Sequence, residues 1–370
     1  MPLKRYFAVL KNFDFILFGA IFLLICFGLA ALYSVAISSE QPNFVNFQKQ
    51  IIFAVIGLVL LFLISFFDYR IWQDYAPFIY GGTALLLLAV LFFGKTISGT
   101  TGWFVIFGFN LQPVELAKLA LIIFLAWFFS TRANSVKDLK SFIQSGSAAA
   151  LFFILVILQP DFGSAMVLFI IWLAIVVFSG VNKKYLLISG LILILVTIFA
   201  WFFLFQDYQR GRVLTFVNPQ AEPYGRGYHV RQAVTAVGAG GFLGRGLGFG
   251  SQSQLKFIPA SQTDFIFAVI AEELGFLGVA LVLFFWGLVF YRLVMAVRSM
   301  RDNFSLIFVL AVAALFFCQV IINIGMNIGI VPVTGISLPF LSYGGSFLIT
   351  SLVLIGITES MIIRNRSSRA

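Results

Sequence analysis

Residues 303–358 form a continuous run of 56 residues that contains no Asp, Glu, Lys or Arg. A single helix of that length would measure about 84 Å at 1.5 Å per residue, whereas the hydrocarbon core of a bilayer is about 30 Å thick. The run also contains a Pro- and Gly-rich segment around 329–345. We therefore predict two membrane-spanning helices in this run, separated by the Pro- and Gly-rich segment.

The composition of the whole chain extends this prediction. Of its 370 residues, 61% are hydrophobic and 10% are charged, whereas soluble domains carry about 25% charged residues. Further apolar runs predict eight more spans, at about 15–39, 50–67, 75–94, 113–131, 142–158, 162–180, 185–206 and 265–291. We therefore predict one all-α polytopic membrane domain over residues 1–370, with ten transmembrane helices. A long loop, 207–264, separates the seventh span from the eighth.

The basic residues predict the orientation of these spans. With both termini in the cytoplasm, 15 of the 24 Lys and Arg residues lie at the inner ends of spans, and only Lys49 and Lys95 lie in short outer loops. Cytoplasmic loops of membrane proteins are enriched in these residues, so we expect the long loop outside. The same distribution argues against nucleic-acid binding despite the net charge of +10, because the cations do not gather on one face or tail.

Ionisable side chains inside predicted spans are few and costly, so each is a candidate for function. Glu115 and Lys118 are three residues apart on one helix face and can form an ion pair. The pair either fixes its helix to its neighbours or provides a cation that lines a cavity for an anionic headgroup. Asp161 follows a tight connection, and we expect it to cap the next helix through the amides of Gly163 and Ser164.

Asp264 stands at the threshold of the eighth predicted span, where water and lipid headgroups both reach it. One interpretation is an N-cap of that helix. The long loop also brings six cations to the same face of the membrane, namely Arg210, Arg212, Arg226, Arg231, Arg245 and Lys256. A carboxylate opposite cations suits a reaction in which a phosphate leaves and a hydroxyl loses a proton.

Two further carboxylates lie inside the eighth span. Glu272 is about 12 Å along the helix from Asp264 and about 80° around it, so the two cannot form a close pair. We interpret Glu272 and Glu273 as buried polar contacts that hold the bundle together. The sequence contains no evident set of metal ligands, because its two cysteines fall in apolar spans and its one histidine lies in a polar loop.

Several long segments resemble the SEDS family (shape, elongation, division and sporulation), which includes the RodA and FtsW proteins. They include LYSVA, LQPVELAKLA, LQPDFGSA, GYHVRQAVTAVGAGGFLGRGLGFGSQSQL, IPASQTDFIFAVIAEELGFLG and GIVPVTGISLPFLSYGGS. The GSQSQL run is more similar to RodA than to FtsW. The chain departs from the family where Pro259-Ala260 replaces the usual Pro-Glu before Thr263 and Asp264.

The resemblance implies a peptidoglycan glycosyltransferase of the bacterial cytoplasmic membrane, active in cell elongation. It would polymerise lipid II at the outer face, beside a class B penicillin-binding protein and among membrane lipids. Asp264 matches the family's catalytic aspartate and would accept the proton of the acceptor hydroxyl in an inverting transfer. The implied substrate-binding positions are Lys118, Glu115, Arg212, Asp161 and Gln232. Lys118, Arg212 or a divalent cation would stabilise the leaving diphosphate.

Two other functions are compatible with the same residues. The Glu115–Lys118 pair and the broken segment around Pro332 and Pro339 are features of transporters, which would make the chain a lipid II flippase. A non-catalytic scaffold for the penicillin-binding protein is the second alternative, although a scaffold gives no reason for ionisable groups within the membrane.

Overall fold

The computed structural model describes residues 11–37, 42–97, 99–106, 108–132, 135–203, 210–211, 216, 226–255 and 257–367. A helix lies at each predicted span. The helices are α2 (Phe15–Ile37), α3 (Val45–Phe66), α5 (Ala76–Phe93), α6 (Pro113–Thr131), α7 (Leu139–Ile157), α8 (Phe162–Phe178), α9 (Lys183–Phe203), α13 (Ile266–Ser299), α14 (Asn303–Asn327) and α15 (Gly345–Ser367). The short α4 (Arg70–Asp74) joins α3 to α5.

Eight of these described helices are long and apolar enough to cross a membrane, and α8 is a shorter apolar helix. The helical polytopic fold is therefore confirmed, whereas the exact count of ten spans and their orientation stay predictions. The charge-free run divides as expected, because α14 ends at Asn327 and α15 begins at Gly345. We call the non-helical residues 328–344 between them the broken segment.

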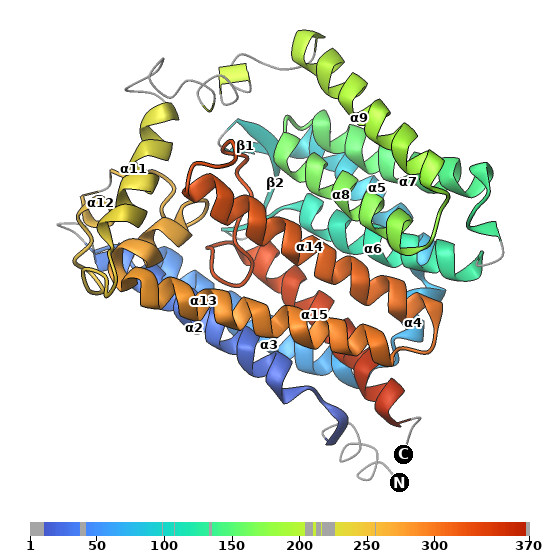
Figure 1. Ribbon diagram of the computed structural model, residues 1–370, viewed down its shortest axis with the longest axis horizontal. Helices are drawn as coiled ribbons and strands as arrows, with labels where there is room; N and C mark the ends of the chain where they lie inside the picture. The colour runs from blue at the N-terminus through green and yellow to red at the C-terminus, as the bar shows by residue number, and fades with distance from the viewer. Residues whose placement is uncertain are drawn as a thin grey trace.

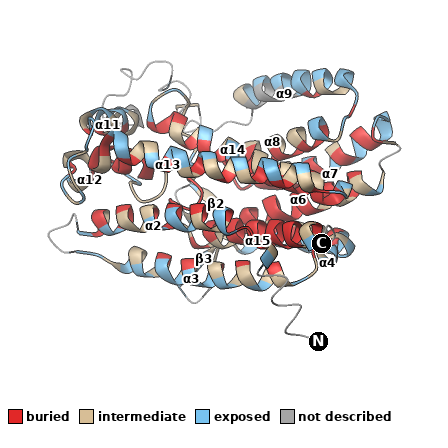
Figure 2. Cartoon of the chain, turned by 60° about the horizontal axis from the view of Figure 1, so that its bottom comes forward, coloured by how far each residue is buried: buried red, intermediate tan, exposed pale blue. Residues whose placement is uncertain are grey.

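The centre of the bundle is formed by α15 and α6. The most apolar window of α15 is 83% buried and that of α6 is 72% buried, whereas that of α5 is only 22% buried. Figure 2 shows the same pattern, with mostly buried residues along α15 and many exposed residues along α3 and α9. The core residues of α15 include buried hydroxyl side chains as well as apolar ones. The helix is therefore surrounded by protein rather than by lipid.

A small antiparallel sheet, which the sequence analysis treated as a short loop, connects α5 to α6. Its strands, in the order β1-β2-β3, are β1 (Lys95–Ile97), β2 (Thr100–Ile106) and β3 (Phe109–Leu111). Residue pairs such as Lys95–Trp103 and Phe104–Leu111 set the register. The strands are rich in Thr, Ile and Phe, which favour a sheet. The structure therefore adds a β-hairpin layer to an otherwise helical bundle.

Ion pairs join the start of α2 to α13 and α15. Asp14, which is 3% exposed, lies immediately before α2 and accepts hydrogen bonds from Arg292 of α13 and, at 3.1 Å, from Arg366 of α15. Its backbone amide donates to the buried Glu359 at 3.1 Å. Figure 1 shows that the start of α2 and the end of α15 lie at the same end of the bundle.

The predicted eighth span is interrupted at Gly275, where φ is +63° within α13. A helix break exposes backbone groups that must find partners inside the protein when the helix lies in a membrane. The partners are in the Gly-rich segment between α11 (Arg226–Ala239) and α12 (Ser251–Gln254). Four backbone hydrogen bonds of 2.9–3.2 Å join the two segments, in the pairs Arg245–Glu272, Gly246–Glu273, Phe276–Gly241 and Leu277–Phe242.

The side chains of the two glutamates beside the break also form hydrogen bonds with the start of α12, directly after the Gly-rich segment. Glu272 accepts hydrogen bonds from the backbone amides of Gln252 at 2.7 Å and Ser253 at 2.9 Å. Glu273 accepts one from the hydroxyl of Ser34 on α2 at 2.6 Å and one from that of Ser253 at 3.2 Å. Both glutamates are at most 1% exposed, so their interpretation as buried polar contacts is confirmed.

Gly244 lies where the two backbones approach closely. Its φ is +79°, and a Cβ atom there would lie 2.2 Å from the carbonyl oxygen of Glu273. We expect Gly244→Ala to destabilise the protein by about 1–3 kcal/mol or more, because it combines an unfavourable φ with a clash against backbone. Thermal unfolding in detergent measures the loss. Gly238→Ala is the matched control, since nothing lies within 4 Å of a Cβ atom there; equal melting temperatures for the two variants would contradict the prediction.

Candidate functional site

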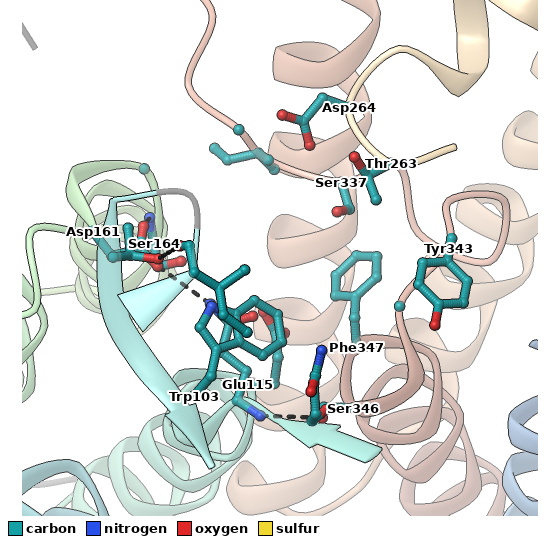
Figure 3. A pocket seen from close by; sticks show the side chains of 18 of the residues that line it. Trp103, Glu115, Asp161, Ser164, Thr263, Asp264, Ser337, Tyr343, Ser346 and Phe347 are labelled. Carbon is teal, nitrogen blue, oxygen red and sulfur yellow. Dashed lines mark hydrogen bonds between the residues drawn. The ribbon is translucent and has the colours of Figure 1, made fainter. Parts of the chain in front are cut away.

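A cavity with a volume of about 490 Å³ opens where the sheet, the start of α8 and the start of α13 meet. Its wall also includes α6 and much of the broken segment, as Figure 3 shows. The volume falls within the range of about 300–1,000 Å³ that is typical of small-molecule sites. From the sheet, Ile97, Thr100, Trp103 and Phe109 contribute to the wall.

This cavity brings together four of the six predicted site residues. Asp264, Asp161, Glu115 and Lys118 all line it, and the first three are visible in Figure 3. They belong to three segments that are far apart in the sequence. Their convergence on one cavity is the main structural support for the predicted site.

The predicted ion pair between Glu115 and Lys118 is present. The Lys118 ammonium group donates to the Glu115 carboxylate at 2.7 Å, and the residues are 5% and 7% exposed. The ammonium group also lies 5.7 Å from the centre of the Phe347 ring. Because a buried charge is tolerable only with a partner, the pair has a structural role, and its place in the cavity wall is compatible with contact to a ligand.

Asp161 is the N-cap of α8, as predicted. Its carboxylate accepts a hydrogen bond from the Ser164 amide at 3.0 Å and one from the Gln112 side-chain amide at 3.4 Å. The helix start lies close to the broken segment, because a Cβ atom at Gly163 would be 2.4 Å from the carbonyl oxygen of Thr334. Asp161 therefore links α6, α8 and the cavity wall.

Asp264 is not the N-cap of α13. That position belongs to Phe265, which makes no capping side-chain hydrogen bond. Instead, side-chain amides of α14 hold this turn: Asn323 and Asn327 donate to the backbone carbonyl of Asp264 at 3.0 and 2.9 Å. Asn327 also accepts from the Ala268 amide at 3.0 Å. The side chain of Asn327 on α14 therefore caps the start of α13. The carboxylate of Asp264 does not, and Asp264 lines the cavity instead.

The broken segment holds the residues that precede Asp264. The hydroxyl of Ser342 donates to the Thr263 carbonyl at 2.7 Å, and the amide of Tyr343 donates to the Gln262 carbonyl at 2.8 Å. The same Ser342 hydroxyl accepts from the Leu338 amide at 2.8 Å. Asp264 is therefore fixed by α14 on one side and by the broken segment on the other.

The outcome differs for the other two predicted site residues. Arg212 lies outside the described residues, and half-buried Gln232 lies on α11 and does not line the cavity. Among the loop cations whose side chains are described, Arg210, Arg231 and Arg245 also lie elsewhere. The expected gathering of loop arginines around Asp264 is thus absent from the described part of the chain.

Lys49 is a cation of the cavity wall that the sequence analysis did not select. Its ammonium group donates to the Gly108 carbonyl at 3.0 Å and lies 5.9 Å from the centre of the Phe109 ring. In the sequence it is a single lysine in a short outer loop, and no local pattern distinguishes it from a solvated side chain. Its role depends on the sheet, which was not predicted.

The chain matches the FtsW/RodA/SpoVE family of cell cycle proteins over residues 14–367. It is 36% identical to the peptidoglycan glycosyltransferase MrdB of Escherichia coli K12 over 311 residues, which are 82% of each chain. It is 32% identical over 355 residues to the probable peptidoglycan glycosyltransferase FtsW of Trichlorobacter lovleyi, covering 94% of this chain and 92% of the relative.

A solved structure is also similar. It comes from a study of a peptidoglycan synthase complex that coordinates polymerization and crosslinking, with a TM-score of 0.81 and 30% identity over 96% of this chain and 98% of the other. The chain therefore belongs to the FtsW/RodA/SpoVE family, also called SEDS. It is a multi-pass protein of the bacterial cytoplasmic membrane.

We expect Lys118→Met to destabilise the protein by about 3–5 kcal/mol, because it leaves the buried Glu115 carboxylate without its partner. Thermal unfolding in detergent measures this effect. The double variant Glu115→Gln/Lys118→Met removes both charges, and we expect it to recover most of the lost stability. If Lys118→Met alone unfolded at the wild-type temperature, the pair would not be a stabilising contact.

Proposed function

We propose that this chain is a peptidoglycan glycosyltransferase that polymerises lipid II at the outer face of the cytoplasmic membrane. The observation that carries the proposal is the convergence of Asp264, Asp161 and the Glu115–Lys118 pair on one cavity. The names of the relatives support the reaction class. The distribution of basic residues supports an outward-facing cavity.

The proposed chemistry is a single displacement at the anomeric carbon of the donor sugar. The Asp264 carboxylate takes the proton from the 4-hydroxyl of the acceptor. The hydroxyl oxygen forms the new bond to the anomeric carbon, and the bond to the lipid diphosphate breaks with its electron pair passing to the diphosphate oxygen. An α-linked donor then yields a β-linked product.

The leaving diphosphate carries negative charge that the site must stabilise. Lys118 is the candidate within the cavity, Lys49 is a second cation in its wall, and Arg212 or a divalent cation are further candidates. Asp161 and Glu115 would then act mainly by holding these groups and the substrate in place. Apolar surfaces between helices would accommodate the lipid tails.

The proposed partner is a class B penicillin-binding protein that crosslinks the new strands. The support is the similarity to a chain from a complex in which polymerization is coordinated with crosslinking. We place the protein in cell elongation on the basis of its RodA-like GSQSQL run. A flippase is the second candidate, and the buried ion pair together with the broken segment favours it.

The central test replaces Asp264 by Asn, which keeps the shape and removes the base. With the purified partner and labelled lipid II, we expect glycan polymer to fall by about 100-fold or more. Asp138→Asn is the control, because Asp138 is an exposed residue that does not line the cavity. Full polymerisation by Asp264→Asn would refute the general-base role, and translocation of lipid II in liposomes without any polymer would favour the flippase.

The role in elongation has its own test. We expect expression of this chain to restore rod shape to bacteria depleted of their elongation polymerase and not to restore division to bacteria depleted of the division polymerase. Microscopy of the two depleted strains measures both outcomes. Rescue of division alone would assign the chain to septal synthesis instead.

A further inference from the structure

Three amide side chains lie on one face of α14, at Gln319, Asn323 and Asn327, each four residues from the next. At this spacing they stack one turn apart. All three are at most 1% exposed. Two have clear structural roles, because Asn323 and Asn327 both donate to the backbone of Asp264, and Asn323 also donates to the Ile336 carbonyl at 2.8 Å.

Gln319 differs from the other two. It lines the cavity, yet its buried amide oxygen has no hydrogen-bond partner among the described residues. The hydroxyl of Thr334, in the broken segment, is a second cavity-lining group whose buried oxygen lacks a partner there. A buried polar atom without a partner costs about 1–3 kcal/mol. Such atoms in natural proteins call for an explanation, and a ligand in this cavity would supply one.

The chemistry of these two groups indicates what they bind. An amide and a hydroxyl are neutral, and each can both donate and accept hydrogen bonds. Anionic groups are better bound by cations, and the ammonium group of Lys118, which lines the same cavity, is already paired with Glu115. Sugar hydroxyl and acetamido groups are neutral and also donate and accept. They therefore match Gln319 and Thr334 better than a phosphate does.

We propose that Gln319 and Thr334 bind a hydroxyl or acetamido group of the lipid-linked sugar and position it relative to Asp264. The inference rests on the proposed function for the identity of the substrate. Gln319 is one turn beyond Asn323, which holds the backbone of Asp264. One face of α14 thus has two roles. Asn323 binds the backbone of the proposed base, Asp264, and Gln319, one turn away, contacts the sugar on which that base acts.

Gln319→Met tests the inference, because methionine has nearly the same shape and no amide. We expect the free protein to unfold at the wild-type temperature or above it, since an unpaired buried amide is removed. We expect the KM for lipid II to rise by about 3- to 10-fold, as the loss of a hydrogen bond to substrate predicts. Thr334→Val should raise KM in the same way, and Thr334→Ser, which keeps the hydroxyl, should restore it.

Asn323→Leu is the contrasting variant, because it removes hydrogen bonds that the free protein already makes, and it should unfold at a lower temperature. If Gln319→Met were destabilised to the same extent with an unchanged KM, Gln319 would be structural and the inference would be overturned. Unchanged KM values for both Gln319→Met and Thr334→Val would also overturn the inference. The amide of Gln319 and the hydroxyl of Thr334 would then bind water and not the substrate.

Direct binding separates the inference from the proposed function. Fluorescent lipid II in detergent should bind Gln319→Met about 3- to 10-fold more weakly than wild type, and Asp264→Asn with near wild-type affinity. Loss of affinity in Gln319→Met without any polymerisation by the wild type would refute the proposed function and support the inference. If the wild type polymerised lipid II and Gln319→Met bound it with unchanged affinity, the proposed function would be supported and the inference would be refuted.

Discussion

The structure depends on the pairing of the broken α13 backbone with the Gly-rich segment. A membrane offers no water to exposed amides and carbonyls, so a helix can break there only where protein replaces the missing partners. At Gly275 the partners come from the segment before α12, and Glu272 and Glu273 hold that segment in place. The first turns of α13, which follow Asp264, are fixed as a consequence.

Local patterns in the sequence were sufficient for much of this structure. The thickness of the bilayer imposes apolar runs of about 20 residues, which is why a helix occurs at each predicted span. The Glu115–Lys118 pair follows from a three-residue spacing within one helix, and the cap by Asp161 follows from residues immediately beside it. Each of these predictions needed only neighbouring residues, and each is present in the structure.

The features that sequence reasoning missed depend on distant residues. An N-cap at Asp264 was reasonable locally, but Asn327, which lies 63 residues further along the chain, takes over the capping of α13. The break at Gly275 lies in an apolar run without proline, and only the distant Gly-rich segment makes it possible. Lys49 reaches the cavity because an unexpected sheet lies beside it. Gln232, which does not line the cavity, was selected by resemblance, and resemblance carries no information on where the long loop lies.

The ion pair between Asp14 and Arg366 also bears on how the protein is made. The two residues are 352 positions apart, so the contact cannot form until almost the entire chain has left the ribosome. Among the described residues, the other ion-pair partner of Asp14 is Arg292 of α13, which is also synthesised late. The final turn of α15 therefore supplies the last-synthesised of the described ion-pair partners of Asp14, and the environment of this buried carboxylate is complete only when translation is nearly finished.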